Sequence, residues 1–167
     1  MVPLFDALTR LPRSHALGVL QSALTEIEVT PDALGESIAI DTAAYVRTLV
    51  FKNPVVEVFV MAWLPGQRSP IHDHRGSACA VRVVSGTALE QIYGVTASGV
   101  AIPTGEPRRI FAGEVCGSFD ADVHSFGNAA KNPAPIRDIL VTLHAYSPPL
   151  APTFKYVEAD PRALIPD

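Results

Sequence analysis

Short runs of β-forming residues, each closed by glycine or proline, extend from residue 45 to residue 147 and constrain the fold more than any other feature. Strands of about four to eight residues separated by such turn residues are typical of antiparallel sandwiches and barrels. The sequence therefore predicts an all-β fold. The expected strands are Tyr45–Phe51, Val55–Trp63, Cys79–Val84, Leu89–Tyr93, Arg108–Phe111, Glu114–Phe119, Val123–Phe126 and Ile136–Tyr146.

The N-terminal part of the chain has helical rather than strand spacing. Apolar residues of one helical face predict a helix over residues 14–28, with Ser14 as its N-cap; they are Leu17, Leu20, Leu24 and Ile27. Pro31 and Asp32 begin a second short helical stretch, which Gly35 can end. His15 lies in this region without a partner, and we assign it no role.

Length and composition favour a single domain. The 167 residues are enough for one buried core, so we expect one domain over 1–167, with a helical segment over 1–42, a barrel over 43–149 and a Pro-rich tail over 150–167 lying on the surface.

A net charge of -4 argues against nucleic acid as a partner. The apolar runs are too short for a membrane span, and no signal peptide precedes them. Two cysteines give no disulfide framework, so we expect a cytoplasmic location. We also expect a monomer.

The tripeptide His72-Asp73-His74 is a candidate metal-binding segment. In a strand, residues two apart point to the same face, so both imidazoles could reach one ion while Asp73 faces away. His124 is the candidate for a third ligand from another strand. Three neutral imidazoles leave the charge of a divalent ion uncompensated, which favours an anionic ligand such as a thiolate. Zinc also accepts three histidines, so the ligands alone leave a zinc hydrolase and an iron oxygenase both open.

The spacing around these histidines resembles the two motifs of the cupin superfamily. The first motif contains Gly66, His72, His74 and Gly86, with Cys79 in the place of the usual glutamate. The second contains Gly113, His124 and Asn128, with Phe119 and Ala121 in the places of its usual proline and second glycine. The cupin fold would bring both segments to one end of a jelly-roll β-barrel.

Within the cupins, residues 45–149 resemble the cysteine dioxygenases. The matching pieces are Tyr45-Val46-Arg47, Ser69-Pro70-Ile71-His72-Asp73-His74, Ser77-Ala78-Cys79, His124 and His144-Ala145-Tyr146-Ser147-Pro148-Pro149. The resemblance implies one Fe(II) per chain and conversion of L-cysteine and O2 to cysteine sulfinate. The N-terminal part does not visibly match.

The resemblance also implies a role for each site residue. The metal ligands are His72, His74 and His124. Arg47, with Tyr45 beside it, binds the substrate carboxylate. Tyr146 is the active-site phenol, and His144 and Thr142 orient it, Thr142 standing where the family usually has serine. Cys79 forms a thioether crosslink to Tyr146, and the Ser147–Pro148 bond is cis.

The residues themselves support part of this assignment. In the last expected strand, Thr142, His144 and Tyr146 share one face. The opposite face carries the charged Arg137 and four apolar residues, Ile139, Val141, Leu143 and Ala145. This alternation fits either a lined pocket or a solvent-facing sheet edge. Arg47 suits a carboxylate clamp, although a surface pair with Glu57 is the ordinary alternative. We expect Cys116 in the core and Trp63 either there or in the pocket wall.

Two other functions stay open at this stage. A related dioxygenase acting on 3-mercaptopropionate is one, although that branch typically has glutamine where this chain has Arg47. A non-catalytic cupin that binds a metal or a small ligand is the other.

Overall fold

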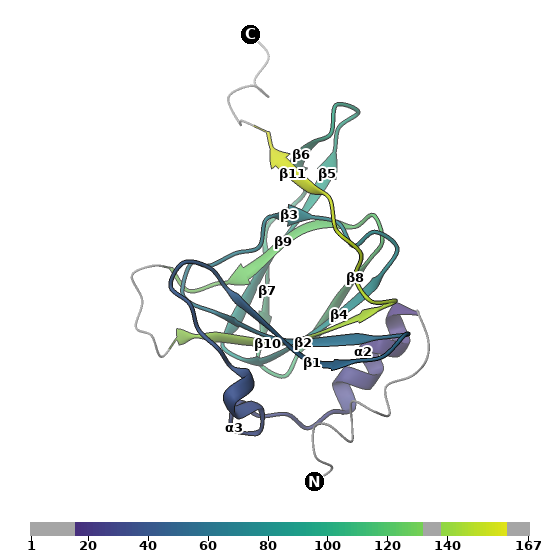
Figure 1. The fold of residues 1–167 in the computed structure, drawn as a ribbon. Helices are drawn as coiled ribbons and strands as arrows, with labels where there is room; N and C mark the ends of the chain where they lie inside the picture. The colour runs from purple at the N-terminus through teal and green to yellow at the C-terminus, as the bar shows by residue number, and fades with distance from the viewer. Residues whose placement is uncertain (1–15, 132–137, 160–167) are drawn as a thin grey trace.

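Two β-sheets form the walls of a barrel in the computed structural model, which describes residues 16–131 and 138–159 (Figure 1). The five-stranded sheet has the order β1 (Val46–Lys52), β2 (Glu57–Trp63), β10 (Leu140–Ser147), β4 (Ala78–Ser85) and β8 (Val115–Phe119). The six-stranded sheet has the order β6 (Val100–Pro103), β11 (Lys155–Glu158), β3 (Ile71–His72), β9 (Val123–Asn128), β5 (Thr87–Val95) and β7 (Arg108–Phe111). The all-β prediction is confirmed.

A helix covers the outer face of the five-stranded sheet. In α2 (Leu17–Glu26), Leu20 and Leu24 are buried against an apolar layer to which β2, β4 and β10 contribute. Gly117 of β8 permits this approach, because a Cβ there would lie only 2.6 Å from the Leu17 side chain and 2.8 Å from the Cys79 carbonyl oxygen. The helix begins at Leu17 with Ala16 as its N-cap, so the prediction of Ser14 as the N-cap was wrong. Ser14 and His15 themselves lie outside the described residues.

The second helical stretch forms as predicted. It is α3 (Pro31–Leu34), in which the hydroxyl of Thr30 accepts a 3.2 Å hydrogen bond from the backbone N–H of Ala33. Gly35 follows with φ of 47°, a conformation that glycine adopts without a Cβ penalty, and a short 3-10 turn, η1 (Gly35–Ser37), comes next.

The central strand β10 separates two apolar clusters. Val141, Leu143 and Ala145 pack beneath α2, whereas Leu140 and Tyr146 belong to the cluster inside the barrel. Every residue of β10 is buried, which excludes the solvent-facing sheet edge as the explanation of its alternating pattern. The expected residues Ile136 and Arg137 lie outside the described residues, and β10 extends one residue further, to Ser147.

Three strands were not predicted. Strand β3 has only two residues, too few to show an alternation of polar and apolar side chains, and β6 is also short. The expected surface tail is only partly a tail, because β11 joins the sheet between β3 and β6, antiparallel to the first and parallel to the second. Proline at positions 148, 149 and 152 suggested an irregular segment, but β11 begins after the last of them.

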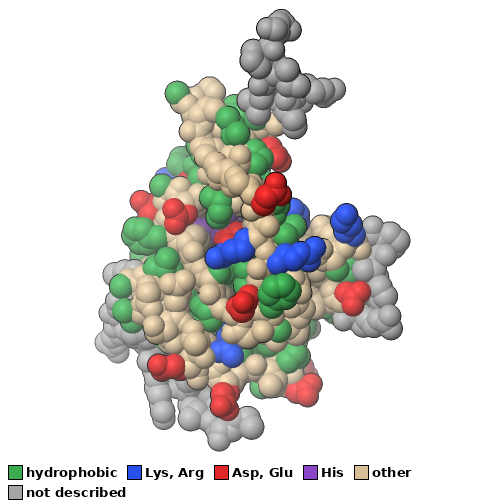
Figure 2. All heavy atoms as spheres, turned by 180° about the vertical axis from the view of Figure 1, so that it is seen from behind, with side chains coloured by type: hydrophobic (Ala, Val, Ile, Leu, Met, Phe, Trp, Pro, Cys, Tyr) green, Lys and Arg blue, Asp and Glu red, His purple; other side chains and the backbone are tan. Residues whose placement is uncertain are grey.

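The exterior is mixed in charge on the face drawn in Figure 2. Acidic and basic side chains lie interspersed there with small hydrophobic areas, and a little histidine surface is visible among them (Figure 2). Among the described residues, no helix has the length and hydrophobicity that a membrane span requires.

Candidate metal centre and its cavity

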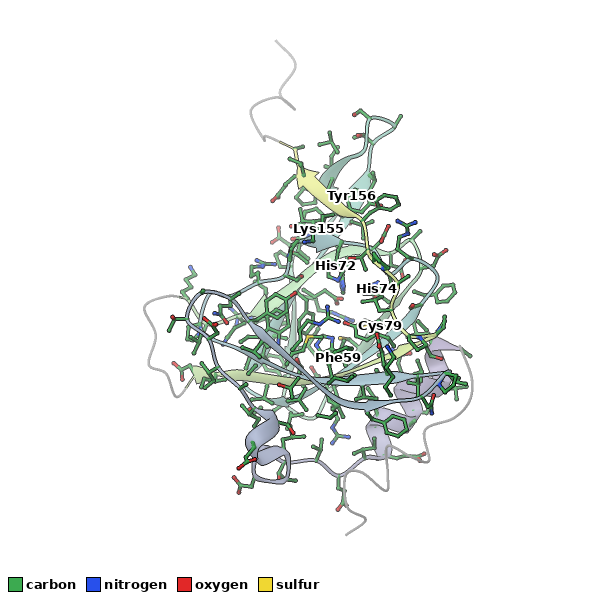
Figure 3. The ribbon with its side chains drawn as sticks, in the orientation of Figure 1. Phe59, His72, His74, Cys79, Lys155 and Tyr156 are labelled. Carbon is green, nitrogen blue, oxygen red and sulfur yellow. The ribbon has the colours of Figure 1, made fainter. Side chains whose placement is uncertain are left out.

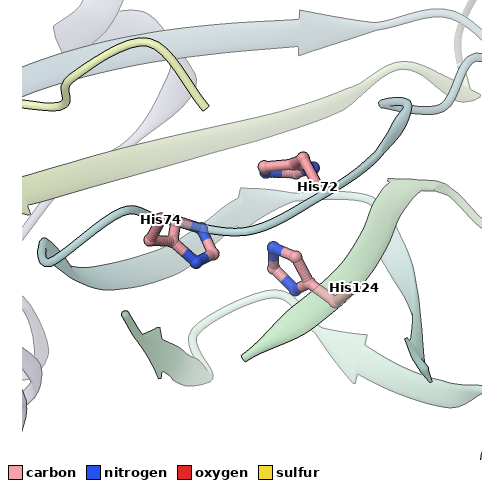
Figure 4. Close-up of side chains that lie close together, drawn as sticks. All are labelled: His72, His74 and His124. Carbon is pink, nitrogen blue, oxygen red and sulfur yellow. The ribbon is translucent and has the colours of Figure 1, made fainter. Parts of the chain in front are cut away.

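Three histidine rings converge on one space inside the barrel (Figure 4). His72 in β3 and His124 in β9 are cross-strand partners, and their ring centroids are 4.9 Å apart. The ring of His74 lies 5.2 Å from that of His72 and 4.9 Å from that of His124. One ligand nitrogen from each ring lies within 4.8 Å of the other two, so a single ion could contact all three.

His74 reaches this space from a loop and not from a strand. The strand argument placed His72 and His74 on one face of a continuous strand, but β3 ends at His72. The backbone N–H of His74 donates to the Asp120 carbonyl at 2.9 Å, and that of Ser77 donates to the His74 carbonyl at 3.1 Å. The same-face argument assumed a strand through His74, and that condition is not met, although the ring of His74 joins the other two.

Hydrogen bonds orient two of the rings toward a shared ion. His72 Nδ1 lies 2.9 Å from the Pro70 carbonyl, which can only accept, so the hydrogen sits on Nδ1. His124 Nδ1 lies 2.8 Å from Oε1 of Glu90 and is a donor for the same reason. Nε2 of each ring is then left with its lone pair, as a metal ligand requires.

The carboxylate of Glu90 is itself buried and paired. Its second oxygen accepts a 2.8 Å hydrogen bond from Arg108. Burial alone would raise the pKa of Glu90, but the hydrogen bond and charge of His124, with the charge of Arg108, hold that pKa below its ordinary value. Glu90 therefore stays ionised and can hold the Nδ1 hydrogen of His124 in place.

Burial also keeps two of the histidines neutral, His72 and His74. It lowers the pKa of His72 to about 4 and that of His74 to about 3, with the neighbouring histidines adding to the effect. Neutral imidazole is the form that binds metal. Three imidazole nitrogens that face one space, two of them on rings whose hydrogens are directed elsewhere, fit a divalent transition metal.

The histidines line a cavity of about 160 Å³. Its wall also includes Arg47 and Tyr45, Trp63 of β2, Cys79 of β4, and His144 with Tyr146 of β10. Figure 3 shows Lys155 close to His72, with Cys79 and Phe59 nearer the five-stranded sheet. The cavity holds a small molecule of a few carbon atoms and brings together all the predicted site residues except Thr142, which lies behind His144.

A chain of hydrogen bonds runs behind the cavity wall. The indole N–H of Trp63 donates to the Thr142 hydroxyl at 3.0 Å, and that hydroxyl lies 2.9 Å from Nε2 of His144. Indole can only donate, so the Thr142 hydroxyl accepts from Trp63 and can donate its own hydrogen to His144. With Thr142 as the donor, the hydrogen of neutral His144 lies on Nδ1, which faces the Tyr146 hydroxyl at 3.4 Å. Desolvation by burial holds the pKa of His144 well below its usual value.

Cys79 and Tyr146 are direct cross-strand partners on β4 and β10. The Tyr146 hydroxyl and the Cys79 thiol interact across this pair. Burial raises the pKa of both groups well above the ordinary values, so thiol and phenol are both protonated at neutral pH. Cys116 is buried in the same interior cluster, as predicted for a core residue.

Arg47 lies at the mouth of the cavity. Its guanidinium carbon is 4.6 Å from the ring centroid of Phe59 and 5.8 Å from that of Tyr146. The alternative pair with Glu57 does not form, because Glu57 binds Lys52 at 2.9 Å. Tyr45 stacks on Trp63 at 4.0 Å, so Trp63 serves both the core and the pocket wall.

Several residues of the site were not found from the sequence. Glu90 was not singled out, because an isolated glutamate in a strand carries no motif. Asp73 was set aside as facing away from the ion, yet it is buried and accepts hydrogen bonds from the C-terminal segment. Leu150, Thr153 and Lys155 of that segment line the cavity. Residues 150–158 carry no motif or alternation that would have marked them.

Comparisons with known proteins agree with this architecture. The family model of cysteine dioxygenase type I matches residues 18–159, so the similarity includes the N-terminal helix that showed no visible match. Among solved structures, an uncharacterized protein with a double-stranded β-helix domain from Klebsiella pneumoniae superposes with a TM-score of 0.60 at 18% identity, covering 80% of this chain and 95% of its own. A Thermus thermophilus protein superposes with a TM-score of 0.53 at 17% identity, covering 74% of this chain and 97% of its own. An oxalate oxidase superposes with a TM-score of 0.54 at 16% identity, covering 80% of this chain and 64% of its own. At these identities the structures show the fold alone.

Proposed function

Because the chain belongs to the cysteine dioxygenase type I family, we propose that it is an Fe(II)-dependent enzyme that converts L-cysteine and O2 to cysteine sulfinate. The observation that carries this proposal is the set of three converging histidines in one cavity with Arg47. A metal site without a carboxylate favours an anionic sulfur ligand, and Arg47 suits the carboxylate of a small thiol acid.

His72, His74 and His124 would hold one Fe(II) per chain. The bound ion would supply redox chemistry and a positive charge that favours the thiolate. Arg47, steadied over Phe59, would bind the substrate carboxylate through its planar fork, with Tyr45 beside it. This contact sets the direction in which the thiol enters the cavity.

Tyr146 would act as a hydrogen-bond donor beside the reacting sulfur. Since Nδ1 of His144 points its hydrogen at the Tyr146 oxygen, the phenolic hydrogen is free to face the cavity or the Cys79 sulfur. Thr142 and Trp63 hold His144 in this tautomer. The cavity walls limit the water around the reacting groups.

We further propose a thioether bond between Cys79 and Tyr146. The two residues face each other across β4 and β10. Joining the sulfur to a ring carbon removes one hydrogen from each residue, and O2 would take up the two protons and two electrons. The same proposal treats the chain as a single cupin domain over 1–167 that acts as a monomer in the cytoplasm.

The iron-dependent consumption of oxygen across a thiol panel tests the proposal. Iron-loaded protein should consume O2 with L-cysteine and release cysteine sulfinate, and metal-free protein should do neither. A kcat/KM much higher for 3-mercaptopropionate than for cysteine would favour the related dioxygenase. Iron-loaded protein that forms no sulfinate from any small thiol would favour the non-catalytic cupin.

A further inference from the structure

Lys155 stands in one cross-strand row with two of the three histidines. On the six-stranded sheet, His124 of β9 pairs with His72 of β3, and His72 pairs with Lys155 of β11. Directly paired residues on neighbouring strands point to the same face of a sheet. The row therefore directs Lys155 toward the cavity that the histidines line, and Lys155 is one of its wall residues (Figure 3).

The segment that carries Lys155 is anchored on both sides of that residue. The backbone N–H of Phe154 donates to Oδ1 of Asp73 at 3.1 Å, and the Tyr156 hydroxyl donates to Oδ2 at 2.9 Å. The guanidinium carbon of Arg75 lies 3.9 Å from the Phe154 ring centroid. Asp73 lies between His72 and His74 in the sequence, so it ties the position of Lys155 to the metal-binding segment.

The charged side chains of the cavity wall are all basic. Arg47 and Lys155 are the cations, and none of the described wall residues is acidic. Neither cation forms an ion pair within the described part of the chain, where Glu57 binds Lys52 and Glu90 binds His124 and Arg108. Two unpaired cations beside a site for a divalent ion favour a ligand with more than one negative charge.

We propose that Lys155 binds a second acidic group where the substrate carries one, so that besides L-cysteine the site also takes small thiols with two carboxylates. This inference rests on the proposed function for the thiol and for Arg47 as the first carboxylate site. Arg47 comes from β1 and Lys155 from β11, on different sheets, so the two cations approach the cavity from different walls. A branched or extended dicarboxylate can meet both, whereas a single carboxylate meets one.

Mercaptosuccinate and 3-mercaptopropionate form a matched pair of probes, since they differ by one carboxylate. In the iron-loaded protein, we expect the kcat/KM ratio of the dicarboxylate to the monocarboxylate to exceed one. Lys155→Met should lower that ratio about tenfold, as expected for the loss of one charge-assisted contact. Lys155→Arg should retain the preference, and Lys131→Met, an exposed lysine outside the cavity wall, should leave it unchanged. An equal ratio in wild type and Lys155→Met would overturn the proposal.

A binding measurement separates this proposal from the proposed function. Calorimetric titration of the metal-free protein with succinate and with propionate needs neither iron nor turnover. We expect succinate to bind about tenfold more weakly to Lys155→Met than to wild type, with propionate much less affected. If no thiol is oxidised but this difference is found, the dioxygenase proposal fails and the role of Lys155 stands. If succinate binds both proteins equally, the role of Lys155 fails whatever the enzyme oxidises.

Discussion

The buried carboxylate of Glu90 accepts a 2.8 Å hydrogen bond from Nδ1 of His124. Carboxylates that hold the far side of a metal-binding imidazole fix its tautomer and direction, and their loss typically weakens metal binding about 10- to 100-fold. We therefore expect Glu90→Gln to lower Fe(II) affinity within that range, measured by competition with a chelator. Glu106→Gln, at an exposed position, is the control. Unchanged affinity in Glu90→Gln would show that the contact does not position His124.

The hydroxyl of Thr142 joins Trp63 to His144, and both partners are buried. Thr142→Val keeps the shape of the side chain but leaves an indole N–H and an imidazole nitrogen without partners. We expect a loss of about 1–3 kcal/mol in the free energy of unfolding, measured with urea. Sulfinate formation should also fall, because His144 loses its fixed tautomer. Thr142→Ser restores the hydroxyl and should recover most of both; a Ser variant as impaired as Val would contradict this role.

The crosslink between Cys79 and Tyr146 is visible by mass spectrometry. After turnover, we expect the intact protein to lose the mass of two hydrogen atoms, and peptide mapping should join the two residues. Cys79→Ser should abolish the change. Cys116→Ser, the matched control at the other buried cysteine, should not. Persistence of the unmodified mass after many turnovers would mean that Cys79 has a different role.

Acid should destabilise the metal-free protein before it protonates the buried histidines. The pKa values of His72 and His74 lie near 4 and 3 in the folded protein, chiefly because of burial, and near 6.5 in an unfolded chain. As the pH falls below about 6.5, the unfolded state gains protons that the folded state does not bind, so the unfolding free energy decreases until about pH 3. The depressed pKa of His144 acts in the same direction.

Urea denaturation in the presence of a chelator, at about pH 7.5 and about pH 5, measures this effect. We expect a lower midpoint at the acidic pH. His72→Asn should show a smaller difference between the two midpoints than wild type. Equal midpoints for wild type would contradict the neutral state of these histidines in the folded protein.

The regular strands could be predicted because their β-forming residues cluster, or their polar and apolar residues alternate, over enough positions to be recognised. Residues 57–63 and 140–147 are rich in β-branched and aromatic side chains and form β2 and β10. Alternation in β10 also predicted correctly that Thr142, His144 and Tyr146 share one face. The two-residue strand β3 offers no such period, and its place is set by pairing with β9 and β11.

The site could be predicted only where residues lie within a motif. His72, His74 and His124 follow known spacings, although His74 reaches the cavity through a loop held by Asp120. Glu90 and Lys155 act through partners that are distant in the sequence, His124 and His72. The register of four strands, β5, β9, β3 and β11, brings them together, and a single sequence does not reveal that register.

Labelling with ¹⁸O₂ tests the central claim most directly. Iron-loaded protein is supplied with L-cysteine and ¹⁸O₂ in unlabelled water, and the sulfinate is analysed by mass spectrometry. The proposed dioxygenase activity predicts that both sulfinate oxygens carry the label and that metal-free protein gives no product. Sulfinate with oxygen from water, or no sulfinate from iron-loaded protein, would contradict the claim.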